Sequence, residues 1–171
     1  MNIVLAPAEP SLAEWWFEDR LDPETRRYNP LAPSSVESLR ERLSMASSNL
    51  TDYEKSDSFF WIVKSGEEIV GHVTLQNINR MMRTAEIGYG VTRMARGRGV
   101  GTRQVRLLAE IVFSLTPIRK LIALVHEQNT PSRKLLENVG FRQEGVLREH
   151  YLVNGVATNE VIYGLLKGEI I

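Results

Sequence analysis

Apolar residues along this chain repeat with different spacings, and the changes in spacing divide it into helices and strands. Between Val100 and Leu115 they recur every three or four positions, which predicts an amphipathic helix. Residues 121–125 form an uninterrupted apolar run, typical of a strand buried on both faces among parallel neighbours. Thr130 and Pro131 suit the cap and first turn of another helix, which we expect to stop at Gly140.

Strand-favouring segments bounded by turn residues predict five further strands. They are residues 59–64, 68–76, 81–91, 145–153 and 156–166. Between the last two stands Asn154-Gly155, a dipeptide suited to a two-residue hairpin turn, so these strands should pair antiparallel. The first two are separated only by residues 65–67 and should form a second hairpin.

The N-terminal third predicts two helices separated by loops. Residues 11–14 (SLAE) and 34–37 (SSVE) match the capping-box pattern of a helix start. The prolines in Asp22-Pro23 and in residues 28–33 interrupt regular elements, so we expect loops there. The element order ααβββαβαββ indicates a single α/β (α+β) domain that covers residues 1–171.

Composition limits the classes of function. The chain has 171 residues, 43% hydrophobic and 25% charged, which is ordinary for one soluble globular domain. The formal net charge of +0 argues against a nucleic acid as the main partner. Without cysteine there is no disulfide, cysteine-ligated zinc site or acyl-cysteine intermediate. No apolar stretch reaches the length of about 18 residues typical of a membrane helix, so we expect a cytoplasmic protein without membrane contact or bound metal.

Three alternate glycines in the sequence RGRGVG, residues 96–101, stand just before the main predicted helix. Glycine lets the backbone approach a phosphate closely, and the N–H groups at a helix N-terminus attract anions. The run is not a P-loop, because Thr102 and Arg103 follow it, and its spacing is not that of a dinucleotide fingerprint. We therefore expect the pyrophosphate of another cofactor; a simple turn or an RNA contact are the alternatives.

The strand before the glycine run has two different faces. Alternation places Ala85, Ile87, Tyr89 and Val91 on one side and Glu86, Gly88 and Gly90 on the other. Two glycines weaken a strand and make room for another group against its backbone. The second face therefore leaves space beside the backbone of this strand.

The glycine run and a later segment together resemble the GCN5-related N-acetyltransferase (GNAT) family. The run matches the family's RxxGxG signature, and the later segment has Asn129, a helix and then Gly140-Phe141. The resemblance implies a mixed central sheet flanked by helices and splayed between residues 84–91 and 120–128, with acetyl-CoA as co-substrate in the gap. The cofactor-binding residues that it implies are Val91 through its main chain, Arg96, Gly97, Arg98, Gly99, Val100, Gly101, Thr102, Asn129 and Ser132.

Acetyl transfer from a thioester to an amine needs a base for the amine, stabilisation of the oxyanion and protonation of the leaving thiolate. Many GNAT enzymes use a tyrosine seven residues after the asparagine as the acid, and here that position is Leu136. In this departure the chain is similar to the Rim-type ribosomal-protein alanine/serine N-acetyltransferases, in which a serine at the place of Ser132 is the proposed acid. The resemblance implies that Ser132 hydrogen-bonds the leaving sulfur.

Glu86 is the first candidate for the base, because it lies on the open face of its strand beside the expected gap. It could act through a water, and an ion pair with a nearby arginine is its alternative role. Glu160 on the last strand is the second candidate. His72, His126 and Glu127 are weaker ones, since a histidine in an apolar strand is usually structural.

Residues 15–28 resemble the opening of Rim-type enzymes, where the first helices wall the acceptor site. Four acidic residues in this segment suit a cationic amine, namely Glu18, Asp19, Asp22 and Glu24. The favoured acceptor is the amine of a protein N-terminal Ala or Ser, attacked directly in a ternary complex. A small amine (polyamine, aminosugar or antibiotic) is the alternative, and a catalytically silent acyl-CoA-binding domain is the alternative of another class. We expect a monomer or a homodimer.

Overall fold

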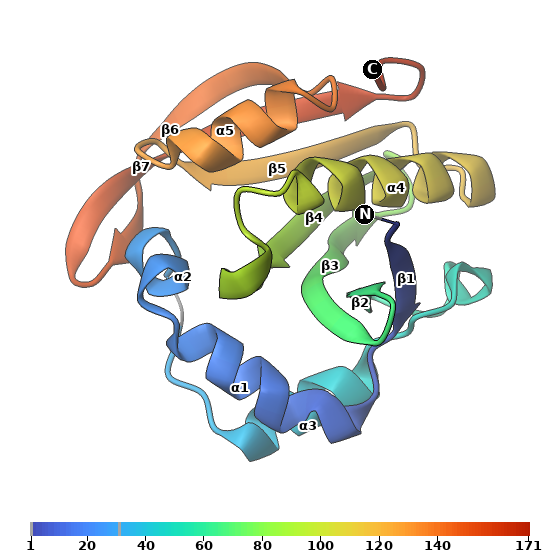
Figure 1. Ribbon diagram of the computed structural model, residues 1–171. Helices are drawn as coiled ribbons and strands as arrows, with labels where there is room; N and C mark the ends of the chain where they lie inside the picture. The colour runs from blue at the N-terminus through green and yellow to red at the C-terminus, as the bar shows by residue number, and fades with distance from the viewer. Residues whose placement is uncertain (1, 31) are drawn as a thin grey trace.

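The computed structural model describes residues 2–30 and 32–171. Met1, and Leu31 in the loop expected at residues 28–33, lie outside the described residues. Within the described ranges seven strands form one mixed sheet in the order β1-β2-β3-β4-β5-β7-β6 (Figure 1). The strands are β1 (Val4–Pro7), β2 (Phe59–Ser65), β3 (Glu68–Asn79), β4 (Thr84–Val91), β5 (Lys120–His126), β6 (Arg142–Val153) and β7 (Val156–Leu166).

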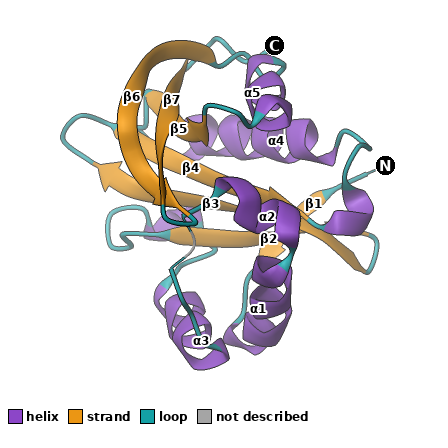
Figure 2. Cartoon of the chain, turned by 90° about the vertical axis from the view of Figure 1, so that its left-hand side faces the viewer, coloured by secondary structure: helices purple, strands orange, loops and turns teal. Residues whose placement is uncertain are grey.

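Helices cover both faces of this sheet, so the predicted mixed α/β architecture is confirmed. They are α1 (Ala13–Leu21), α2 (Pro23–Tyr28), α3 (Val36–Met45), α4 (Val100–Leu115) and α5 (Thr130–Glu137). Figure 2 shows α4 and α5 on one face and α1 and α3 on the other. Strand β2 serves both layers: Phe59, Trp61 and Val63 pack in the core that includes α4, whereas Phe60 and Ile62 pack with α1 and α3.

Helix α2 occupies part of a segment in which the sequence predicts loop. Pro23 is at its first position, where the missing N–H would have no helical partner. Asp22 caps the helix, because its Oδ2 accepts a hydrogen bond from the Thr25 N–H at 3.0 Å. The prediction of loop at Asp22-Pro23 is therefore wrong: here proline begins a helix.

The starts of the neighbouring helices also differ from the capping-box prediction. Ser11 lies in a 3-10 turn, Pro10–Leu12, and α1 begins at Ala13 without a side-chain cap. In α3 the capping box is formed one residue later than predicted, between Ser35 and Ser38. Strand β1 has no counterpart in the sequence prediction, since only its pairing with β2 makes it a strand.

Several strand and helix ends lie a few residues from their predicted places. β4 begins at Thr84 rather than at residue 81, because Arg83 takes a left-handed φ of 55° in the turn before it. β3 extends to Asn79, and β6 already begins at Arg142. α5 ends at Glu137, before the expected glycine.

Strand β5 alternates in burial, which corrects the prediction of a strand buried on both faces. Leu121, Ala123 and Val125 are buried, whereas Ile122 and Leu124 on the other face are half-buried. The strand pairs antiparallel with β7 along its whole length and parallel with β4 only at one end. Its apolar residues on the second face therefore remain available to line a cavity.

The sheet splays between β4 and β5, as the resemblance to the GNAT family implies. Pairing joins Thr84–Glu86 to residues 120–122 and then stops, although the strands continue to Val91 and His126. β5 ends at His126, two residues before the expected end. Backbone groups on the β5 side of β4 beyond Glu86 therefore have no strand partner, which leaves them for a ligand.

Candidate active site

A cavity of about 1070 Å³ opens at the splay and reaches from the N-terminus of α4 to α1, α2 and α3. Its volume is sufficient for a cofactor arm and an acceptor together. All but one of the predicted cofactor and catalytic residues line it. They are Glu86, Val91, Arg96, Gly97, Gly99, Val100, Gly101, Thr102, Asn129 and Ser132, and the exception is Arg98.

The glycines before α4 are needed mainly for their backbone conformation. Gly97 and Gly99 have φ values of 71° and 73°, which other residues rarely adopt. Gly99 is the N-cap of α4 and provides no side chain for capping, so the first N–H groups of this helix are left for an anion. At Gly101 a Cβ would instead collide with Leu135 of α5, which means that this glycine permits the two helices to pack closely.

Arg96 ties the glycine loop to α2. Its Nη2 donates to Asp22 Oδ2 at 2.6 Å and to Thr25 Oγ1 at 3.2 Å, and its Nε donates to the Val91 carbonyl at 3.2 Å. Burial alone would raise the pKa of Asp22, but the hydrogen bonds from Arg96 and Thr25 outweigh burial and lower it. Arg96 thus holds the loop in place, and the wall formed by α2 depends on the same ion pair.

Asn129 and Ser132 meet at the start of α5. Asn129 Oδ1 accepts a hydrogen bond from the Ser132 N–H at 3.2 Å, so Asn129, rather than the predicted Thr130, caps this helix. The Ser132 hydroxyl shares a 2.6 Å hydrogen bond with the hydroxyl of Tyr89. Two groups far apart in the sequence therefore form one hydroxyl pair that lines the cavity.

Tyr89 is a functional candidate that the sequence analysis missed. Alternation assigns it to the face of Ala85 and Ile87, both of which are buried in the core. Beyond Glu86 the strand has left β5, so the Tyr89 ring reaches from the core edge into the splay. Burial raises the pKa of Tyr89 far more than the bond to Ser132 lowers it, and its hydroxyl stays protonated at neutral pH.

The two predicted base candidates both line the cavity but have different surroundings. Glu86 accepts hydrogen bonds from Gln76 Nε2 at 3.2 Å and from Asn77 Nδ2 at 2.9 Å. Asn77 is held there by a bulge in β3, where its φ is 50°. Glu86 thus has amide partners in place of the arginine considered from the sequence.

Glu160 is 2% exposed, and its Oε1 has no hydrogen-bond partner among the described residues. It lies opposite His126 of β5 and Leu147 of β6, on the central strand β7 of this part of the sheet. Burial raises the pKa of Glu160 from 4.5 to about 7. A buried carboxylate with this pKa, facing a cavity, is suited to take up a proton near neutral pH.

Comparison with known proteins agrees with this geometry. The family profile described as acetyltransferase (GNAT) domain matches residues 2–142. The chain belongs to the GNAT family. It is 30% identical over 159 residues to the uncharacterized N-acetyltransferase p20 of Bacillus licheniformis, across 92% of this chain and 86% of that protein. The protein is thus an acetyl-transferring enzyme.

Two solved structures of related fold were determined with CoA or a CoA derivative bound. RimJ of Mycobacterium smegmatis, in complex with CoA-disulfide, has a TM-score of 0.85 and 24% identity, covering 98% of this chain and 83% of that one. Spermidine N-acetyltransferase of Vibrio cholerae, in complex with CoA and spermine, has a TM-score of 0.86 and 20% identity, covering 98% and 96%. At these identities the likeness shows the fold alone, so the acceptor has to be argued from this enzyme's own residues.

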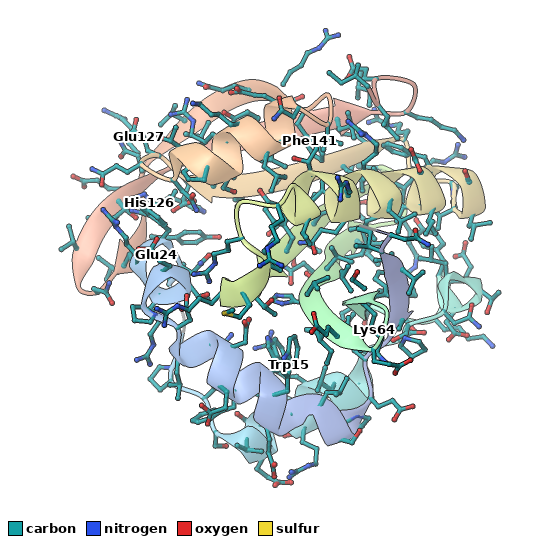
Figure 3. All side chains as sticks on the ribbon, in the orientation of Figure 1. Trp15, Glu24, Lys64, His126, Glu127 and Phe141 are labelled. Atoms are coloured by element: carbon teal, nitrogen blue, oxygen red, sulfur yellow. The ribbon has the colours of Figure 1, made fainter. Side chains whose placement is uncertain are left out.

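The weaker base candidates of this GNAT enzyme take part in other hydrogen bonds, although His126 also lines the cavity. His126 Nδ1 accepts a hydrogen bond from the Gln128 N–H at 3.1 Å, and Glu127 Oε2 accepts one from Asn159 Nδ2 at 3.1 Å. Figure 3 shows His126 at the end of β5 near α2, where the Tyr28 ring lies 5.3 Å from the imidazole. Glu127 does not line the cavity.

His72 lies against β4, and the glycines of that strand make space for it. A Cβ at Gly90 would collide with the His72 ring, and one at Gly88 would lie 2.5 Å from Thr74 Oγ1. The glycine face thus receives side chains of β3, and Gly88 and Gly90 also line the cavity. Burial lowers the pKa of His72 to about 4, and Arg20 contributes, so this imidazole is neutral.

The segment expected to hold the acceptor contributes only some of its residues to the cavity. Trp16, Asp19 and Glu24 line it, together with Arg20 of α1 and Arg42 of α3, which the sequence analysis missed. The cavity lining does not include Trp15, Phe17, Glu18 or Asp22. Figure 3 labels Trp15 on α1 and Glu24 on α2. The expected acidic acceptor site is therefore reduced to two carboxylates beside two arginines.

Membrane and metal sites can be assessed for the described ranges. No helix there is long and apolar enough to cross a membrane. In residues 2–30 and 32–171 no group of three His, Asp or Glu side chains is arranged to hold a metal ion.

Proposed function

We propose that this enzyme acetylates the α-amine of a protein N-terminus, favouring Ala or Ser, by direct attack on acetyl-CoA in a ternary complex. The observation that carries the proposal is the buried Glu160, whose pKa is about 7. An α-ammonium group has a pKa of about 7.7–8.0, whereas a lysine-like alkyl ammonium has one of about 10.4. Transfer of a proton to Glu160 therefore costs about 1 kcal/mol from the first and about 5 kcal/mol from the second.

Glu160 is assigned as the base rather than Glu86, because the two carboxylates differ in their partners. Glu86 already accepts hydrogen bonds from two amides, which fix its position. Glu160 has an unpartnered oxygen, so it gains a hydrogen-bond partner when the amine donates to it. It takes the amine proton as the new C–N bond forms.

The N-terminus of α4 is assigned to the pyrophosphate of acetyl-CoA. Its first N–H groups and the helix dipole provide the attraction for an anion. Beyond Glu86, backbone groups of β4 that β5 does not pair are the donors and acceptors for the pantetheine and for the oxyanion. Asn129, which lines the same space, contributes its side-chain amide.

Ser132 and Tyr89 together stabilise the leaving thiolate. Either hydroxyl can donate in this bond, and when Tyr89 donates to Ser132 Oγ, the Ser132 proton is free to point toward the sulfur as the C–S bond breaks. A thiol has a pKa of about 8.5, below that of either hydroxyl, so the pair supplies hydrogen bonds rather than a complete proton transfer. Leu136, which stands where many GNAT enzymes have tyrosine, is fully buried in the core.

An acceptor panel tests the proposal. Release of free CoA thiol would be measured with Ala- and Ser-initiated peptides, with the same peptides carrying a blocked N-terminus and an internal lysine, and with spermidine. We expect turnover on the free N-termini and little on the blocked peptides. Equal turnover on blocked lysine peptides would contradict the assignment of an α-amine.

A small cationic amine is the second candidate acceptor, because Asp19 and Glu24 line the cavity. A higher kcat/KM for spermidine than for any peptide would indicate that the acceptor is a small amine. Binding of acetyl-CoA without turnover on any acceptor would instead indicate a catalytically silent domain. The cytoplasmic location and the monomeric or homodimeric state stay predictions.

A further inference from the structure

Two guanidinium groups gather around one tryptophan at the acceptor end of the cavity. Arg20 Cζ lies 5.7 Å from the centroid of the Trp16 ring, and Arg42 Cζ lies 4.8 Å from it. All three side chains line the cavity, and Trp16 is itself 4% exposed. Arg20 and Arg42, which we call the arginine pair, come from α1 and α3, so packing of the two helices brings them together.

In the part of the chain that the structure describes, the arginine pair has no acidic partner. Among the described residues no carboxylate oxygen lies within 4.0 Å of either guanidinium. Arg20 is held by hydrogen bonds to Ser34 Oγ and to the Ala32 carbonyl, both at 3.2 Å, which fix its position without neutralising it. Burial lowers the pKa of Arg20, and repulsion from Arg42 and Arg26 lowers it further.

The two carboxylates of α1 and α2 that line the cavity have other basic neighbours, and Glu24 Oε1 lies 3.7 Å from Arg27 Nη1. Asp19 lies 3.9 Å from His72 Nδ1, and burial raises the pKa of Asp19 while the charge of Arg96 opposes this. His72 is neutral, as described above. The Trp16 ring attracts both guanidinium groups, but the two like charges still repel each other without a counter-ion, and an anion brought by a ligand would relieve this repulsion.

We propose that the arginine pair binds a carboxylate of the acceptor, so that the enzyme's acceptor carries both an α-amine and a carboxylate. This inference rests on the proposed function and specifies its substrate class. The planar guanidinium presents donors in the geometry that a carboxylate accepts, and a polycation is repelled by the same pair. The carboxylate belongs either to an acidic side chain near a peptide N-terminus or to the main chain of a free amino acid.

Matched acceptors test the inference. In the peptide series, Ala-initiated peptide amides with a single Glu at the second, third or fourth position would be compared with the same peptides carrying Gln there. In the amino-acid series, alanine would be compared with alaninamide. Binding to the CoA-saturated enzyme is measured by calorimetry, and KM by thiol release. We expect the carboxylate member of at least one series to bind about tenfold more tightly than its amide.

Substitution of Arg20 and Arg42 tests whether these residues cause the preference for a carboxylate. R20Q and R42Q should each reduce the preference, and the double variant should abolish it, with acetyl-CoA affinity unchanged. R40Q is the control, because Arg40 lies on the same helix as Arg42, pairs with Glu37 at 2.5 Å and does not line the cavity. R42Q alone decides the matter should R20Q not fold, since Arg42 is exposed.

The possible results separate this inference from the proposed function. The inference would be overturned if each carboxylate acceptor and its matching amide bound with equal affinity, even where peptides are acetylated. A preference for the carboxylate that persists in the double variant would overturn it too. A carboxylate preference that depends on the pair, without acetylation of any α-amine, would support the inference and overturn the proposed function. A preference in the peptide series or in the amino-acid series identifies the source of the carboxylate.

Discussion

Replacing Glu160 by Gln should remove activity and at the same time stabilise the protein at alkaline pH. Its folded-state pKa of about 7 lies above the ordinary value of 4.5, so the folded protein binds the proton more tightly than the unfolded chain does. Stability contributed by the protonated carboxyl is present in full below pH 4.5 and is lost as pH rises toward 7. The difference corresponds to about 3 kcal/mol, since one pKa unit is about 1.4 kcal/mol.

The variant Glu160→Gln removes this ionisation and keeps the shape of the side chain. Urea unfolding of both proteins at pH 5 and pH 8 would show whether the variant gains about 2.5 kcal/mol of unfolding free energy at pH 8 relative to pH 5. Glu110→Gln is the control, because Glu110 is exposed on α4 and lies outside the cavity. The same relative stability at both pH values would refute the burial argument.

Activity supplies the second half of this prediction. For the wild-type enzyme kcat/KM should fall below pH 7, as Glu160 becomes protonated. Loss of a general base typically costs a factor of about 10² to 10⁴ in rate, and the variant should show this without a change in acetyl-CoA affinity. Full activity of Glu160→Gln between pH 5 and pH 8 would show that Glu160 is not the base and would favour Glu86 in that role.

Three further changes test other parts of the site. Tyr89→Phe should lower kcat about tenfold while acetyl-CoA affinity and thermal stability stay close to wild type, and an unchanged kcat would remove this hydroxyl from the mechanism. Gly101→Ala should push Leu135 and α5 outward, costing about 1–3 kcal/mol of unfolding free energy and weakening acetyl-CoA binding measured by calorimetry. Asp22→Asn should leave Arg96 without its charged partner and cost about 1–2 kcal/mol in urea unfolding, with weaker acetyl-CoA binding; unchanged values would show that the ion pair is dispensable.

Local sequence determined the elements of this protein that depend on residues close together in the chain. The repeat of apolar positions predicts α4, and the glycines before it predict the anion-binding N-terminus, because amphipathicity and backbone freedom are properties of short segments. The Asn154-Gly155 turn and the hairpin around it are predicted for the same reason. Local reasoning failed at α2, where the proline that favours a loop in isolation occupies the first position of a helix capped by Asp22.

Only the tertiary structure decided the chemistry inside the splay. Tyr89 and Ser132 stand on different elements, and their hydrogen bond depends on where β4 leaves β5. Glu160 is the stronger base candidate because packing buries one of its oxygens without a partner, a property that no neighbouring residue in the sequence reveals. Local preferences act over a few residues, whereas burial and the pKa values that follow from it are set by segments far apart in the chain.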